Sequence, residues 1–87
     1  MPNETAAYGH IGVIGAGAWG TALAAAAAIA GRTVTVWARE SEVVDSINSR
    51  HENALFLAGV NLPDAVTATG DLPAAAQSDA LLIGAPV

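Results

Sequence analysis

The sequence of 87 residues contains no cysteine and no lysine. Three arginines stand against eight carboxylates, which gives a formal net charge of −5. The absence of cysteine excludes disulfides, thiolate metal ligands and a cysteine nucleophile. Because there is no basic stripe that could displace counterions, nucleic acid is not expected as a partner.

Charged residues are also scarce, at 13% of the chain, whereas hydrophobic residues make up 53%. This composition is typical of a packed globular domain and not of a disordered segment. The first ten residues lack a basic region followed by an apolar core, so no secretory signal is indicated. The length leaves room for one small domain.

One stretch without charge, residues 11–31, covers 21 residues and is in principle long enough to cross a bilayer as a helix. Glycines interrupt it, and alanine contributes little transfer free energy compared with leucine or phenylalanine. A membrane helix with small-residue contacts is therefore kept only as an alternative. The preferred interpretation, without a membrane partner, is a strand, a turn and a helix.

Short apolar segments alternate with helical ones along the chain. Strands are expected at residues 8–14, 33–38, 66–68 and 80–86, where apolar, β-branched or aromatic residues gather. Helices are expected at 18–30 with Gly31 as the C-terminal glycine, at 41–47 with Ser41 as N-cap, and from Asp71 onward, where Pro73 follows the N-cap. Residues 48–64 are expected to form an ordered loop with one helical turn at most. This alternation predicts an α/β fold with a parallel sheet.

A Gly-x-Gly-x-x-Gly motif lies between the first expected strand and the first expected helix. In that context Gly15 allows a sharp turn, Gly17 allows the backbone to approach a pyrophosphate, and Gly20 allows the helix to pack closely on the strand. Backbone amides at the helix start can bind phosphate without any lysine. The motif therefore predicts a Rossmann-type dinucleotide-binding domain, and the alternative is a glycine turn with a structural role only. The expected cofactor-binding residues of the turn are Gly15, Ala16, Gly17, Ala18, Trp19 and Gly20, with the Trp19 side chain packed between helix and loop.

The end of the second expected strand departs from this fingerprint. An acidic residue that holds the ribose hydroxyls is normally found there, whereas this chain has Ala38 and then Arg39. Arginine can pair with a 2′-phosphate and stack on adenine. Our hypothesis is that NADPH is accepted and preferred over NADH. The alternative is that Arg39 is a solvated charge or pairs with Glu40 or Glu42.

No catalytic residue and no metal site are predicted. His10 and His51 each lack a carboxylate or second histidine at metal-ligand spacing, so both are expected to be structural. The serines belong to no nucleophile motif.

Several spaced segments resemble the bacterial NAD(P)-dependent sn-glycerol-3-phosphate dehydrogenases. In chain order they are residues 14–24, 36–39, 47–48, 51–53, 62–63, 68–69 and 71–72. The resemblance implies reversible hydride transfer between dihydroxyacetone phosphate and glycerol 3-phosphate in the cytoplasm, which feeds phospholipid synthesis. It also implies that Ala18, Trp19 and Arg39 contact the cofactor, NADP or NAD, with Pro86 near the nicotinamide side.

Two segments depart from the family pattern. Residues 56–59 read Phe-Leu-Ala-Gly where the family usually has Tyr-Leu-Pro-Gly, and residues 85–87 continue differently after the fourth expected strand. The family's catalytic lysines, one of which polarises the ketone, and its helical substrate domain have no counterpart here. Residues 1–87 are therefore expected to be the N-terminal part of an incomplete dinucleotide-binding domain, with the substrate domain absent. Such a chain is expected to bind cofactor without turning over the small phosphorylated triose.

Other functions stay open beside this expectation. The chain could be an incomplete folding unit without a small-molecule function, its last strand forming an exposed apolar edge. It could also come from another Rossmann reductase of hydroxy acids, which the matches at residues 51–53 and 62–63 disfavour. A homo-oligomer is kept open as the assembly of the complete enzyme.

Overall fold

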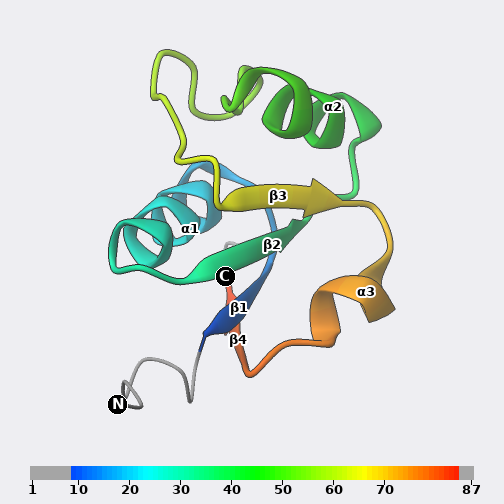
Figure 1. The fold of residues 1–87 in the computed structure, drawn as a ribbon. Coiled ribbons are helices and arrows are strands. Elements are labelled where there is room, and N and C mark those ends of the chain that lie inside the picture. The colour runs from blue at the N-terminus through cyan, green and yellow to red at the C-terminus, as the bar shows by residue number, and fades with distance from the viewer. Residues whose placement is uncertain (1–8, 85–87) are drawn as a thin grey trace.

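The computed structural model describes residues 9–84 (Figure 1). In chain order the elements are β1 (His10–Ile14), α1 (Ala18–Ile29), β2 (Thr33–Trp37), α2 (Ser41–Arg50), β3 (Val66–Thr69), α3 (Leu72–Ala76) and β4 (Ala80–Ile83). The four strands form one parallel sheet in the order β3-β2-β1-β4. The predicted α/β class and the Rossmann-type parallel sheet are confirmed.

β1 lies inside the sheet between β2 and β4. Ile11 pairs with Val34 of β2 on one side and with Ala80 of β4 on the other. The chain builds the sheet outward from β1 to β3 and then crosses back to place β4 on the far side of β1. Strand order therefore reverses next to β1, and ligands of open α/β sheets bind outside the carboxyl ends of the strands at such a point.

The two faces of the sheet differ because side chains alternate along each strand. One face is apolar and packs against α1 and α2, which bury Ala24, Val43 and Ile47 there. Valines at alternate positions of β1, β2 and β3 complete this core, and they are Val13, Val34, Val36 and Val66. Val43 and Ile47 are spaced four residues apart, which places them on one side of α2.

The opposite face of the sheet is mixed, with small and polar residues in β1 to β3 and large apolar side chains toward the carboxyl ends and in β4, such as Trp37, Leu81 and Ile83. Gly12 lies under α3, and a Cβ at this position would collide with the carbonyl oxygen of Ala75. His10 bridges to the next strand, since Nδ1 lies 2.8 Å from Thr33 Oγ1 and Nε2 lies 2.9 Å from Thr35 Oγ1. These two contacts confirm the predicted structural role of His10. Figure 1 shows α1 and α3 on opposite sides of the strands.

The long uncharged stretch is divided among three pieces of structure. It forms β1, the glycine turn and α1, which has 12 residues. Among residues 9–84, no helix combines the length and the apolar character needed to cross a membrane. The interpretation of this stretch as strand, turn and helix is confirmed.

Helix ends differ in detail from the sequence-based expectation. Gly31 follows α1 with φ +95°, as expected of a C-terminal glycine. Ser41 was expected as N-cap but is the first helical residue of α2, because Glu40 already has extended backbone angles and its carbonyl accepts the Val43 amide at 3.1 Å. α2 continues past residue 47 to Arg50 and ends where His51 adopts the left-handed region at φ 55°.

The remaining bounds follow the expectation closely. Asp71 occupies the N-cap position of α3 as predicted, although its carbonyl and not its side chain accepts the Ala74 amide, at 3.1 Å. β4 ends at Ile83, earlier than residue 86, and residues 85–87 lie outside the described residues. Residues 51–65 form the predicted ordered loop, which contains turns and one isolated bridge between Asn53 and Leu57.

Candidate functional site

The glycine turn joins the carboxyl end of β1 to the start of α1. Gly15 has φ +107°, a backbone conformation that residues with a Cβ rarely adopt. Its amide donates to the carbonyl oxygen of Trp37 at 3.1 Å, which ties the turn to the end of β2. The sharp turn predicted at Gly15 is confirmed.

The other two glycines of the motif have different surroundings. A Cβ at Gly17 would have no heavy atom within 4 Å, so the space in front of it is open. A Cβ at Gly20 would collide with the Gly15 carbonyl oxygen and lie 3.4 Å from the Cα of Gly84. Close packing at Gly20 is therefore confirmed, and Gly17 leaves room for another molecule.

The start of α1 offers backbone amides to that open space. Among the described residues, the first amide of α1 that meets a backbone acceptor is that of Thr21, which donates to the Gly17 carbonyl oxygen at 2.9 Å. The amides of Ala18, Trp19 and Gly20 precede it, at the positive end of the helix dipole. Such a helix start binds anions, and phosphate in particular.

The side chain of Trp19 does not pack between helix and loop as predicted. It is 67% exposed, because the residues of α1 that face the sheet are Gly20, Thr21 and Ala24. With 3.6 residues per turn, Trp19 points well away from that stripe. Only its backbone belongs to the turn.

A cleft of about 380 Å³ opens beside the turn, at the carboxyl ends of β1 and β2. The side chains and backbone that line it belong to Gly15, Ala16, Gly17, Trp37, Arg39, Glu40 and Phe56. The fold thus brings Arg39 next to the glycine turn, as the cofactor hypothesis requires. Ala18, Trp19 and Gly20 continue the same turn without lining the cleft, and Pro86 lies outside the described residues.

Arg39 is the one basic residue among the described residues that line the cleft. No pairing of its guanidinium with Glu40 or Glu42 occurs within 4.0 Å, since the ion pair found in residues 9–84 joins His51 Nε2 to Asp64 Oδ1 at 3.5 Å. Glu40 lines the same cleft, so one cationic and one anionic side chain border it together.

Three residues in or near the cleft are not among the cofactor-binding residues predicted from the sequence. They are Thr21, Asn53 and Phe56. Asn53 is fully buried, and its Nδ2 donates to the carbonyl oxygen of Ala16 and to Thr21 Oγ1, each at 2.8 Å. Its Oδ1 accepts the Phe56 amide at 3.1 Å. The available signal was positional, since Thr21 directly follows the glycine motif and Asn53 ends the matched segment at residues 51–53.

His51 begins the loop that follows α2. Its Nε2 faces Asp64, and its Nδ1 is buried without a hydrogen-bond partner. Among residues 9–84, no group of three or more histidine, aspartate or glutamate side chains is arranged to hold a metal ion.

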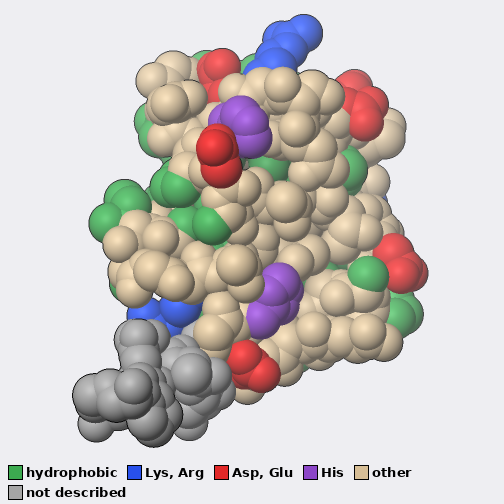
Figure 2. Space-filling model, viewed as in Figure 1, with side chains coloured by type: hydrophobic (Ala, Val, Ile, Leu, Met, Phe, Trp, Pro, Cys, Tyr) green, Lys and Arg blue, Asp and Glu red, His purple; other side chains and the backbone are tan. Residues whose placement is uncertain are grey.

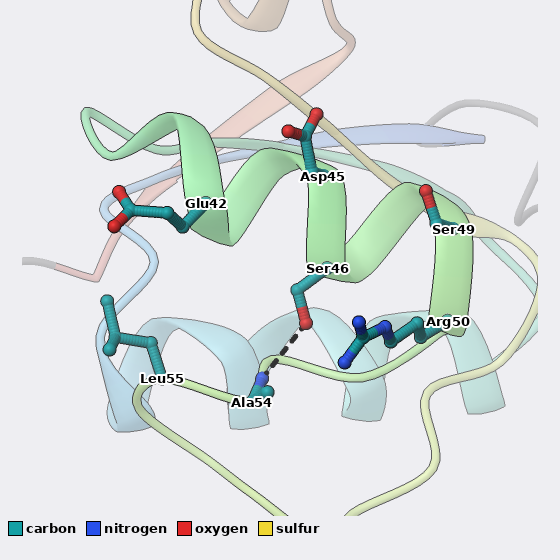
Figure 3. Close-up of a pocket in the computed structure, with 7 residues that line it drawn as sticks. All are labelled: Glu42, Asp45, Ser46, Ser49, Arg50, Ala54 and Leu55. Carbon is teal, nitrogen blue, oxygen red and sulfur yellow. Dashed lines mark hydrogen bonds between the residues drawn. The ribbon is translucent and has the colours of Figure 1, made fainter.

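A second hollow of about 530 Å³ lies between α2 and the loop that follows it (Figure 3). Its lining consists of Glu42, Asp45, Ser46, Ser49, Arg50, Ala54 and Leu55. The hydroxyl of Ser46 is already engaged, because it accepts the Ala54 amide at 3.1 Å and donates to the Glu52 carbonyl oxygen. These hydrogen bonds of Ser46 hold the loop against α2. The hollow shares no lining residue with the cleft beside the glycine turn.

Charged side chains do not form a concentrated basic surface on the face of the molecule that Figure 2 shows. On the face shown in Figure 2, acidic side chains stand apart from one another and no broad basic patch is visible. Neither the net charge of −5 nor this face offers a basic surface for an anionic ligand.

The resemblance drawn from the spaced segments is confirmed by comparison with known proteins. Glycerol-3-phosphate dehydrogenase (NAD(P)+) of Parvibaculum lavamentivorans is 58% identical over 82 residues, which cover 94% of this chain and 25% of that protein. The enzyme of the same name from Paramagnetospirillum magneticum is 58% identical over 76 residues, or 87% of this chain and 28% of that protein. The chain thus spans about a quarter of the length of these relatives.

Solved structures agree with the fold. Glycerol-3-phosphate dehydrogenase from Coxiella burnetii superposes with a TM-score of 0.78 at 34% identity, covering 88% of this chain and 24% of that one. The enzyme from Saccharomyces cerevisiae gives a TM-score of 0.78 at 30% identity, covering 87% and 25%. A family model described as NAD-dependent glycerol-3-phosphate dehydrogenase N-terminus matches residues 10–87. The chain therefore belongs to the NAD-dependent glycerol-3-phosphate dehydrogenase family and corresponds to its N-terminal part.

Proposed function

We propose that the chain binds NAD(P) in the cleft beside the glycine turn, as the dinucleotide-binding part of a glycerol-3-phosphate dehydrogenase. The observation that carries this proposal is the meeting of Gly17 and Arg39 in one cleft at the carboxyl ends of β1 and β2. The names of the relatives, which specify NAD(P)+, support the same cofactor.

The residues present fit such a cofactor. The open space at Gly17 admits a pyrophosphate, and the amides of Ala18 and Trp19 can donate to its oxygens. Toward the β2 side, the Arg39 guanidinium and the Phe56 ring suit an adenosine, because both can stack on a base. The chain therefore supplies a phosphate site and a base site along one cleft.

We further propose that NADPH binds more tightly than NADH. The Arg39 guanidinium can form charge-assisted hydrogen bonds with a 2′-phosphate. Glu40 borders the same cleft and can accept from the ribose hydroxyls of NADH. The pair is consistent with binding of both cofactors, with Arg39 setting the preference.

In the complete enzyme, the proposed reaction interconverts dihydroxyacetone phosphate and glycerol 3-phosphate. The bound nicotinamide supplies or accepts the hydride. The residues of this chain hold and orient the cofactor, and a chain without lysine lacks the ammonium group that would polarise the ketone. The triose phosphate substrate, the cytoplasmic location and a homo-oligomeric assembly belong to this proposal for the complete enzyme.

Calorimetric titration of the chain with NADPH and with NADH tests the proposal. Saturable binding of one cofactor per chain is expected, together with thermal stabilisation of about 2.7 kcal/mol at a hundredfold excess over the dissociation constant. A chain that melts cooperatively, yet shows neither heat nor stabilisation with either cofactor at millimolar concentration, would refute the proposed cofactor binding, whereas a chain without a cooperative melt would be an incomplete folding unit.

A further inference from the structure

The side chain of Asn53 connects two walls of the cofactor cleft. Its Nδ2 bonds to the carbonyl oxygen of Ala16 within the glycine turn and to Thr21 Oγ1 within α1, each at 2.8 Å. Its Oδ1 bonds to the amide of Phe56, the aromatic residue that lines the cleft together with Arg39, at 3.1 Å. One amide group thus spans from the phosphate side of the cleft to the loop that carries its aromatic wall.

The network is closed and shielded from solvent. Asn53 and Thr21 are both 0% exposed. The two acceptors of Nδ2 use both N–H groups of the asparagine amide, and the Thr21 hydroxyl in turn donates to the Ala16 carbonyl oxygen at 3.3 Å. The Ala16 carbonyl therefore receives two donors, which fix the orientation of the peptide bond between Ala16 and Gly17. A missing partner would leave a buried polar group unpaired, at a considerable cost.

We infer that Asn53 is a positioning residue for the cofactor. By holding the Ala16 carbonyl and the Phe56 amide with the same side chain, it sets the glycine turn and the aromatic wall at a fixed separation. A dinucleotide that touches both walls depends on this separation, because misplaced contacts weaken binding even when each group is present. This inference rests on the proposed function.

A second asparagine in the chain provides a matched control. Asn48 also bonds to backbone through both the nitrogen and the oxygen of its side-chain amide. Nδ2 donates to the Ala68 carbonyl oxygen at 2.9 Å, and Oδ1 accepts the Ala68 amide at 2.8 Å. These bonds tie α2 to β3, and neither residue lines the cleft. Asn53→Asp and Asn48→Asp make the same chemical change, an N–H donor replaced by an oxygen, in two different places.

Calorimetric titration with NADPH compares the two variants with the unmodified chain. Asn53→Asp is expected to weaken binding about tenfold or more, because a carboxylate oxygen faces the Ala16 carbonyl oxygen. Asn48→Asp is expected to stay within about twofold of the unmodified chain. A folded Asn53→Asp variant that also binds within twofold, or an equal loss in Asn48→Asp, would overturn the inference.

Thr21 supplies a second pair of variants in case Asn53→Asp does not fold. Thr21→Val keeps the shape and removes the hydroxyl that accepts from Asn53, and several-fold weaker binding of NADPH is expected. Thr21→Ser keeps the hydroxyl and should bind within about twofold of the unmodified chain. Equal affinity of Thr21→Val and the unmodified chain would overturn the inference.

Amide hydrogen exchange in the ligand-free chain tests the connection without any cofactor. In Thr21→Val, exchange at the Phe56 amide is expected to accelerate, while exchange at the Ala68 amide, held by Asn48, stays unchanged. Unchanged exchange at Phe56 would overturn the inference. Failure of the unmodified chain to bind NADPH would instead defeat the proposed function, and the exchange rate at Phe56 would still decide whether Asn53 couples the two walls.

Discussion

Gly17 and Gly20 belong to one turn, yet substitution should affect them in different ways. Gly17 has φ −68°, and a Cβ there meets open space, so Gly17→Ala is expected to leave the unfolding free energy within about 0.5 kcal/mol of the unmodified chain. The same methyl group would occupy the space proposed for the pyrophosphate. A loss of NADPH affinity of about tenfold or more is expected, measured by calorimetry beside a thermal melt.

Gly20→Ala serves as the control for that prediction. Its Cβ would collide with the Gly15 carbonyl oxygen, so a loss of about 1–3 kcal/mol in stability is expected before any ligand is added. If Gly17→Ala instead lowered stability and left affinity intact, the open space at Gly17 would have no role in binding.

Arg39 carries the proposed preference for NADPH. Arg39→Ala should weaken NADPH binding by about ten- to a hundredfold, because a charge-assisted hydrogen bond contributes about 1.5–3 kcal/mol, and should change NADH binding much less. Arg50→Ala removes the same charge from the other hollow and should alter neither affinity. The preference would be refuted by tighter binding of NADH than of NADPH that persists in Arg39→Ala.

The roles of some of these residues could be predicted from their residue type, and the roles of others could not. The roles of Gly15 and Gly20 were predictable, because a positive φ angle and a backbone contact both demand glycine. The role of Asn53 was not, because its partners lie in the glycine turn and in the loop, and only the folded path of residues 51–57 brings them together. The packing predicted for Trp19 was wrong because it depends on which stripe of α1 faces the sheet.

At the scale of elements, α3 packs on β1 at Gly12. A Cβ there would collide with the Ala75 carbonyl oxygen and lie 2.7 Å from the Leu81 side chain. Gly12→Ala is therefore expected to displace α3 and to lower the unfolding free energy by about 1–3 kcal/mol, measured by urea denaturation.

Gly70→Ala is the matched control for Gly12→Ala. The nearest heavy atom to a Cβ at Gly70 is the Ala38 carbonyl oxygen at 3.8 Å, an ordinary contact. Little change in stability is expected, within about 0.5 kcal/mol. Equal destabilisation by the two substitutions would show that glycine flexibility, and not the packing of α3, explains the loss.

Strands and helices were predictable as elements, but their ends were not all predictable. Alternating threonine and valine in β2 match one polar and one apolar face. The start of α2 was misplaced because serine is a common N-cap, whereas here the backbone of Glu40 already provides the first acceptor. Its extension to Arg50 follows from tertiary contacts, such as those of Asn48 with β3, that periodicity does not reveal.

For the molecule as a whole, β4 is an edge of the sheet in the described residues and carries exposed apolar side chains. Ile83 is 67% exposed, and its neighbours Leu81 and Leu82 are exposed as well. Concentration-dependent association is expected, and Ile83→Lys should reduce it in sedimentation velocity. Ile29→Lys, at an isoleucine 78% exposed at the end of α1, should have little effect. Equal effects of both substitutions would mean that general hydrophobicity, and not the strand edge, drives association.

The overall class was predictable from the alternation of segments, and the parallel sheet followed from it. The order of strands did not follow from local patterns, because no short segment shows that the chain crosses from β3 back to the far side of β1. Arg39 could be linked to the glycine turn only through that class of fold, in which the ends of β1 and β2 meet.

The position of β1 has a consequence for synthesis of the protein. Ile11 needs Val34 on one side, which is available early, and Ala80 on the other, which is made 69 residues later. At roughly 5–20 residues per second, the ribosome takes several seconds to produce that second neighbour. During this interval one edge of the strand that leads into the glycine turn has no neighbour from its own chain, and a chaperone that shields this edge would act before β4 joins the sheet.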